Sequence, residues 1–99
     1  MTCDPGRDVV KTMSITRAEF ARSLARLDED AVLDAGGAAQ VRAAGVAARI
    51  QFDELPPLRL GGLLAMPQAR VAIGLPEASS AERREFLARF AVAFQRGGG

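Results

Sequence analysis

The sequence contains no histidine, tyrosine, tryptophan or asparagine, and it has one lysine and one cysteine, Cys3. Histidine is the most common general base and a frequent metal ligand, so its absence removes much acid–base and metal chemistry. A single cysteine excludes an intrachain disulfide and gives little support to redox chemistry. We therefore expect a protein that is not an enzyme, with no metal and no cofactor.

Long hydrophobic runs are also absent. The longest stretch without a charge covers residues 60–69 and is interrupted by Gly61, Gly62 and Pro67, whereas a membrane-spanning helix needs about 20 largely apolar residues. The N-terminus carries charges with no apolar stretch behind them, unlike a secretory signal. These features predict a cytoplasmic protein without a membrane anchor.

Charge of one sign is not in excess, because 13 basic residues and 12 acidic residues leave a net charge of +1. Nucleic-acid-binding domains usually carry a clear cationic excess on one face, so this balance argues against nucleic acid as a partner. Of the basic residues, 12 are arginine, and 19 positions are alanine. This bias is typical of a GC-rich coding sequence rather than of phosphate recognition.

The 99 residues, of which 48% are hydrophobic and 25% charged, predict one ordinary globular domain. Residues 1–12 have no periodicity, and we expect a disordered leader there; translation starting at Met13 is an alternative. The domain itself is expected over residues 13–96, followed by a flexible glycine tail at residues 97–99.

Two signals predict a helix over residues 17–27. Thr16 and Glu19 have the spacing of a capping box, and Phe20 and Leu24 recur at helical spacing. Whether the helix continues or restarts through residues 32–33, before Gly36 and Gly37, stays open.

The middle of the chain has the period of β-strands. Residues 38–48 fit either a helix or a short strand with a turn at Gly45. From Val46 apolar residues alternate, which predicts a strand that ends at Pro56 and Pro57 because proline cannot donate to a sheet.

Two further strands are expected over residues 58–66, with a bend at Gly61 and Gly62, and over residues 69–75. The short connections favour antiparallel neighbours, since parallel strands need a long crossover. Together with the preceding strand they predict a three-stranded antiparallel meander.

Ser79 and Glu82 form a second capping box, and the apolar residues that follow recur every three or four positions. They are Phe86, Leu87, Phe90, Ala91 and Phe94. This pattern predicts an amphipathic helix with Gly97 as its C-terminal cap. The fold class is therefore α+β, with an N-terminal helix, a three-stranded antiparallel meander and a C-terminal amphipathic helix packed on one sheet face. The five phenylalanines, which include Phe20 and Phe52, are expected to form one core.

Acidic residues give two candidate sites of low specificity. Asp53 and Glu54 are adjacent and follow an apolar run, but no nucleophile or histidine accompanies them, so a polar strand end is the favoured interpretation. The acidic group at residues 28–34 comprises Asp28, Glu29, Asp30 and Asp34. Its spacing lacks the glycine turn and terminal glutamate of a calcium loop, which favours a solvated helix end.

Three arginines of the last helix, Arg83, Arg84 and Arg89, make weak binding of an anion or nucleic acid an alternative function. The N-terminus of that helix would add a positive partial charge. Glu82 and Glu85 reduce the attraction.

The ending Gln95-Arg96-Gly97-Gly98-Gly99 resembles the tails of ubiquitin and of the bacterial sulfur-carrier proteins. In those families the terminal carboxylate is activated as an adenylate, and the tail follows a strand of a β-grasp fold. The resemblance implies a carrier that acts through Gly98 and Gly99. The alternation of Phe90, Val92 and Phe94 would suit a strand, whereas the capping box favours a helix.

The main expectation is a small, non-catalytic interaction or structural protein that self-associates, most simply as a homodimer. Three strands leave free sheet edges, and so small a sheet can gain burial by pairing its edges or its faces with a second copy across a two-fold axis.

Overall fold

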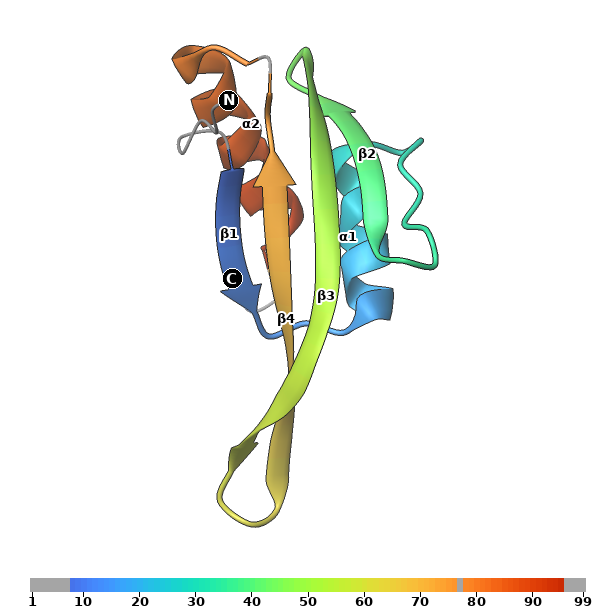
Figure 1. Ribbon diagram of the computed structural model, residues 1–99, viewed down its shortest axis with the longest axis vertical. Helices are drawn as coiled ribbons and strands as arrows, with labels where there is room; N and C mark the ends of the chain where they lie inside the picture. Colours follow the sequence, from blue (N-terminus) through green and yellow to red (C-terminus); the bar gives the residue numbers. More distant parts are fainter. Residues whose placement is uncertain (1–7, 77, 96–99) are drawn as a thin grey trace, which may run out of the picture.

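The computed structural model describes residues 8–76 and 78–95 and has two helices packed on one face of a four-stranded antiparallel sheet (Figure 1). Along the chain the elements are β1 (Asp8–Met13), α1 (Arg17–Leu27), β2 (Ala38–Ala43), β3 (Val46–Leu60), β4 (Leu64–Gly74) and α2 (Ser80–Ala93). The strands lie in the order β1-β4-β3-β2. The predicted α+β class with an antiparallel sheet is confirmed.

The predicted number of strands and the position of the helix at the start of the fold are wrong. β1 precedes α1 and pairs with β4, from Asp8 opposite Gly74 to Met13 opposite Ala69. Residues 8–12 therefore belong to the sheet and not to a leader. β1 is a short edge strand, and Val10, Lys11 and Thr12 are all exposed, so alternation does not reveal it. The rest of the expected leader and the glycine tail at residues 97–99 lie outside the described residues.

For residues 38–48 the sequence allowed either a helix or a short strand with a turn at Gly45. The structure has the strand, β2, and the turn. β2 pairs with β3 from Ala38 opposite Gln51 to Ala43 opposite Val46. β2, β3 and β4 thus form a meander, and β1 extends it beside β4.

The expected separate strand over residues 58–66 is also wrong. β3 runs for 15 residues through Pro56 and Pro57, and the turn at residues 61–63 joins it to β4. A bulge accommodates the prolines: Leu55 lies opposite Gln68 and Leu58 opposite Met66, so β3 has one residue more than β4 between these pairs. Prolines are tolerated in bulges and on edges, where the missing N–H is not needed.

Both helices begin at the predicted capping boxes. The Thr16 N–H donates to Glu19 Oε1 at 3.0 Å and the Glu19 N–H donates to Thr16 Oγ1 at 3.1 Å. Ser79 and Glu82 make the same reciprocal pair at the start of α2. α1 ends at Leu27 with Asp28 as its cap, so it does not continue towards residues 32–33.

All five phenylalanines are buried in one core between the helices and the sheet, as predicted. The Phe20 ring of α1 lies 4.7 Å from that of Phe52 on β3 and 5.0 Å from that of Phe94, centroid to centroid. Phe90 stacks on Phe94 at 4.2 Å. Tilted and stacked pairs at these distances add to the hydrophobic gain from burial. This cluster joins α1, β3 and the end of α2.

Candidate functional site

The distal parts of β3 and β4 leave the sheet as a two-stranded arm, defined here as residues 54–68 (Figure 1). β1 accompanies β4 only as far as Ala69, and β2 accompanies β3 only to Gln51. Figure 1 shows the arm projecting beyond both helices. None of its residues is buried, and only Met66 and Gln68 are half-buried. The arm therefore contributes little to the core of its own chain.

The register of the arm places its large apolar side chains on a single face. Directly opposed residues share a face, and residues alternate between faces along each strand. In a regular strand Leu55 would share a face with Pro57 and Arg59. The extra residue in the bulge shifts the alternation by one position, so Leu55 shares a face with Leu58 and Leu60 instead. We call the resulting surface the leucine face; it consists of Leu55, Leu58, Leu60, Leu64 and Met66.

The reverse face of the arm carries side chains that are polar or smaller than leucine. The same register places Glu54, Arg59, Ala65 and Pro67 there. Glu54 and Arg59 are the arm's ionisable residues, so the arm is an amphipathic ribbon.

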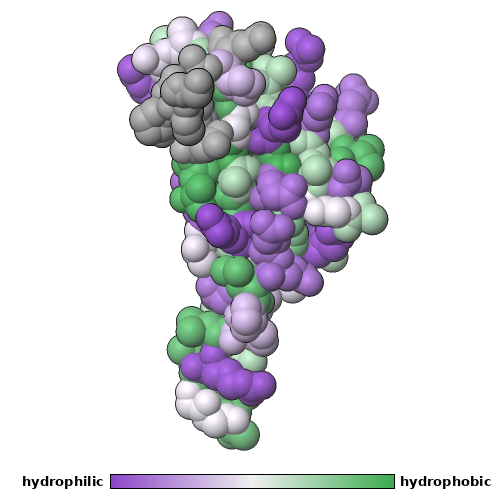
Figure 2. Space-filling view, viewed as in Figure 1, coloured by the Kyte–Doolittle hydropathy of each residue, from purple (hydrophilic) through white to green (hydrophobic). Residues whose placement is uncertain are grey.

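The leucine face is open to solvent. The exposed fractions of its leucines run from 37% at Leu55 to 57% at Leu64, and Leu63 in the turn is fully exposed. Together with Leu63, these leucines expose roughly the surface of three complete leucine side chains. Burying this surface against a partner would contribute about 4–9 kcal/mol to the free energy of binding. Figure 2 shows hydrophobic residues on the arm, below a sheet face that is largely hydrophilic. Contiguous apolar patches of this kind mark interaction sites.

The edges of the arm are poorly suited to pairing with another strand. Pro56 and Pro57 on β3 and Pro67 on β4 lack the N–H that a neighbouring strand would need. Each edge retains only three uninterrupted residues, 58–60 and 64–66. The accessible feature of the arm is thus its face.

The edge of β2 is covered by carboxylates of the acidic group. Asp28 Oδ2 accepts from the Arg42 N–H at 2.8 Å, and Asp34 Oδ1 accepts from the Ala38 N–H at 2.9 Å. Both N–H groups belong to β2 and would otherwise be available to another strand. Within residues 8–76 and 78–95, no three carboxylate, histidine or cysteine side chains gather as metal ligands would.

The hydrogen bond from the Arg42 N–H, followed by that from the Asp30 N–H, holds the pKa of Asp28 below its ordinary value. Both bonds favour the charged carboxylate. Sequence reasoning missed this role, because Asp28 and Arg42 are 14 positions apart in the sequence and come together only in the folded chain.

Asp53 and Glu54 do not form a carboxylate pair. Adjacent strand residues point to opposite faces, and Asp53 Oδ1 accepts a hydrogen bond from Gln51 Nε2 at 3.1 Å. Both residues are exposed at the base of the arm.

The three arginines of α2 are not brought to one face. At about 100° per residue, Arg83, Arg84 and Arg89 point in three different directions around the helix. Arg89 forms an exposed ion pair with Glu85 at 3.4 Å, Arg83 is half-buried and Arg84 is exposed. This arrangement does not converge on an anion.

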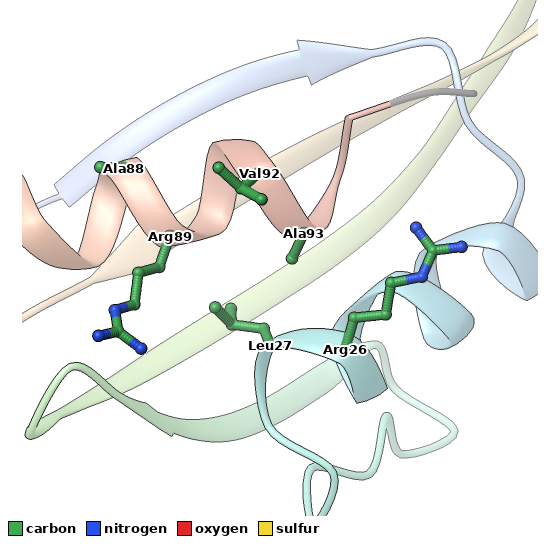
Figure 3. A pocket seen from close by; sticks show the side chains of 6 residues that line it. All are labelled: Arg26, Leu27, Ala88, Arg89, Val92 and Ala93. Atoms are coloured by element: carbon green, nitrogen blue, oxygen red, sulfur yellow. The ribbon is translucent and has the colours of Figure 1, made fainter. Parts of the chain in front are cut away.

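A shallow cleft of about 430 Å³ lies between α1 and α2 (Figure 3). Leu27 points across it towards α2, whereas the guanidinium of Arg26 points away. Val92 lines it with 70% of its surface exposed, and Ala91, which was expected on the buried stripe, is also exposed. The lining contains neither a nucleophile nor a general acid or base; it consists of Arg26, Leu27, Ala88, Arg89, Val92 and Ala93.

Residues 80–93 form a helix where a carrier of the β-grasp type would have a strand before its tail. Gly98 and Gly99 lie outside the described residues.

No family model, curated protein or solved structure matches the chain. In the part of the chain that the structure describes, neither helix has the length and apolarity needed to cross a bilayer.

Proposed function

We propose that this protein is a non-catalytic interaction protein that binds through the leucine face of its arm. The observation that carries the proposal is the bulge-aligned row of exposed leucines on a ribbon that neither helix nor a further strand covers in the described part of the chain. An apolar surface outside the core has no role in stabilising this fold, so a binding role accounts for it best.

The magnitudes indicate what kind of partner the leucine face requires. Burying the arm's leucines would contribute about 4–9 kcal/mol, whereas association itself costs about 4–15 kcal/mol. The arm alone therefore barely offsets the cost of binding. A partner must bring an apolar surface of similar size.

The chemistry of the arm supports binding rather than catalysis. Glu54 and Arg59 lie on the reverse face, away from the leucines. The leucine face itself presents no group that could act as a nucleophile, acid or base.

Site-specific photo-crosslinking in the source cell tests this proposal. A photoreactive residue at Leu60, on the leucine face, is expected to give covalent adducts, because that face is in contact with a partner. The matched control places the same residue at Arg59, one position away on the reverse face. Equal yields from the two positions, or none from Leu60, would contradict the proposal.

A further inference from the structure

We infer that the partner of the leucine face is a second copy of this chain, packed leucine face against leucine face across a two-fold axis. This inference rests on the proposed function and names its partner. The sequence suggested pairing by sheet edges or by sheet faces, and the inference assigns the contact to the leucine face of the arm.

The leucine face is compatible with itself. A two-fold interface sets the same patch of two copies against each other, so a charged patch would repel its own copy. Leu55, Leu58 and Leu60 face Gln68, Met66 and Leu64 across the ribbon, and none of these six side chains carries a charge. Each copy also supplies the apolar surface that the other needs.

A second copy doubles the apolar surface available for burial. Each arm exposes roughly the surface of three complete leucine side chains, so two arms packed face to face can bury about six. One arm alone barely offsets the cost of association, whereas two leucine faces supply twice that burial.

The edges of the sheet are less suitable for association than the leucine face. Asp28 and Asp34 accept hydrogen bonds from two outward N–H groups of β2, those of Arg42 and Ala38, and prolines interrupt both edges of the arm. The remaining edge strand, β1, carries the exposed Lys11, the kind of side chain that discourages edge pairing. Face-to-face packing needs none of these edges.

The row of leucines sets the arrangement of the two arms. Leu58 is the middle one of the three β3 leucines in the leucine face. With the two-fold axis perpendicular to the ribbons at this point, the arms run antiparallel and Leu58 of both copies lies near the axis.

Light scattering during size-exclusion chromatography of the full chain tests the inference. We expect a mass of about twice 10.5 kDa, and a dissociation constant about 100-fold higher for Leu58→Ser/Leu60→Ser, because each dimer then loses four leucines from its interface. The matched control, Arg59→Ser/Ala65→Ser, changes two residues on the reverse face of the same arm and should remain dimeric. Unchanged circular dichroism of both variants excludes misfolding.

A cross-link locates the axis. In a Cys3→Ser background, Leu58→Cys should be joined to its own copy by a short bis-maleimide, whereas Arg59→Cys should not. Equal cross-linking at the two positions would overturn the face-to-face arrangement.

The remaining outcomes separate this inference from the proposed function. A dimer that the leucine substitutions do not weaken would overturn both, since association would then use another surface. A monomer at high concentration overturns the two-copy inference. If Leu60 still gave specific adducts with a different protein in the cell, the proposed function would stand.

Discussion

Ala44 occupies a backbone conformation that glycine normally takes. Its φ is +54°, and the following Gly45 has a φ of +74°, in the two-residue turn between β2 and β3. Two positive φ values in succession are characteristic of a type I′ turn, whose twist matches that of the flanking strands. In this conformation the Cβ of an L-residue costs about 1–2 kcal/mol. Ala44 is thus a strained residue in a turn that the hairpin requires.

Ala44→Asn should stabilise the protein by about 1 kcal/mol, because Asn-Gly is the sequence that this turn favours most. For a domain of this size such a gain raises the melting temperature by about 4–8 °C, which a thermal melt followed by circular dichroism measures. Gly45→Ala, a control with the opposite expected effect, should lower the melting temperature. No change in either variant would show that the turn has another conformation.

At the scale of elements, the loop after α1 acts as a cover for β2. Asp28 and Asp34 bind backbone N–H groups of that strand, and Gly37 brings the loop against β3, where its carbonyl accepts from the Phe52 N–H at 2.7 Å. A Cβ on Gly37 would lie 2.1 Å from the Phe52 carbonyl oxygen. Glycine is therefore required there for the close approach of the two backbones.

The lowered pKa of Asp28 predicts a pH dependence for this element. Its contribution to stability is fully present above the unfolded pKa of about 3.9, and it is lost as the pH falls through the lower pKa of the folded state. Asp28→Asn should therefore lower the melting temperature by a few degrees at pH 7, and the difference from the original chain should shrink towards pH 2.

Glu29→Gln is the control for that series, because the structure describes no hydrogen bond to the Glu29 side chain. Its melting temperature should follow that of the unsubstituted chain across the pH range. A difference for Asp28→Asn that stays constant with pH would show that the carboxylate charge is not what holds the loop.

At the scale of the whole molecule, the chain consists of a packed body and an arm that the body does not need. The buried residues lie between Ile15 and Phe52 and between Ala69 and Phe94. The arm falls between these two ranges. The core and the proposed binding surface thus lie in different parts of the sequence.

Replacing residues 56–67 by Asn-Gly should leave the body folded. Leu55 and Gln68 already face each other, so a two-residue turn can join them. We expect a monomer whose melting temperature is within about 3 °C of that of the full chain at low concentration and does not depend on concentration. Loss of the cooperative melt would show that the arm supports the core.

The sequence was sufficient for the features that depend on local spacing. Thr16 and Ser79 located both helix starts, and the recurrence of Phe86 and Phe90 located the core face of α2. Both signals act within a few residues. The edge strand β1 and the arm were not predicted, because both depend on which strands pair. A proline pair such as Pro56 and Pro57 ends a strand inside a sheet but is accommodated on a free ribbon.

The candidate site was less accessible to sequence reasoning for the same reason. The leucines and prolines of residues 55–67 were visible, but the face they share depends on a register offset of one residue. The role of Asp28 likewise depends on a strand that begins 10 residues further along the chain. Tertiary contacts decide both features.

The doubled proline in β3 has a consequence for how this protein could diversify. Loss of one of the two codons would remove the bulge and restore regular pairing, with Leu55, Leu58 and Leu60 still side by side. The ribbon would then bend and twist less. In the dimer that we propose, a single in-frame deletion would therefore change the angle between the two molecules while retaining every side chain of the leucine face.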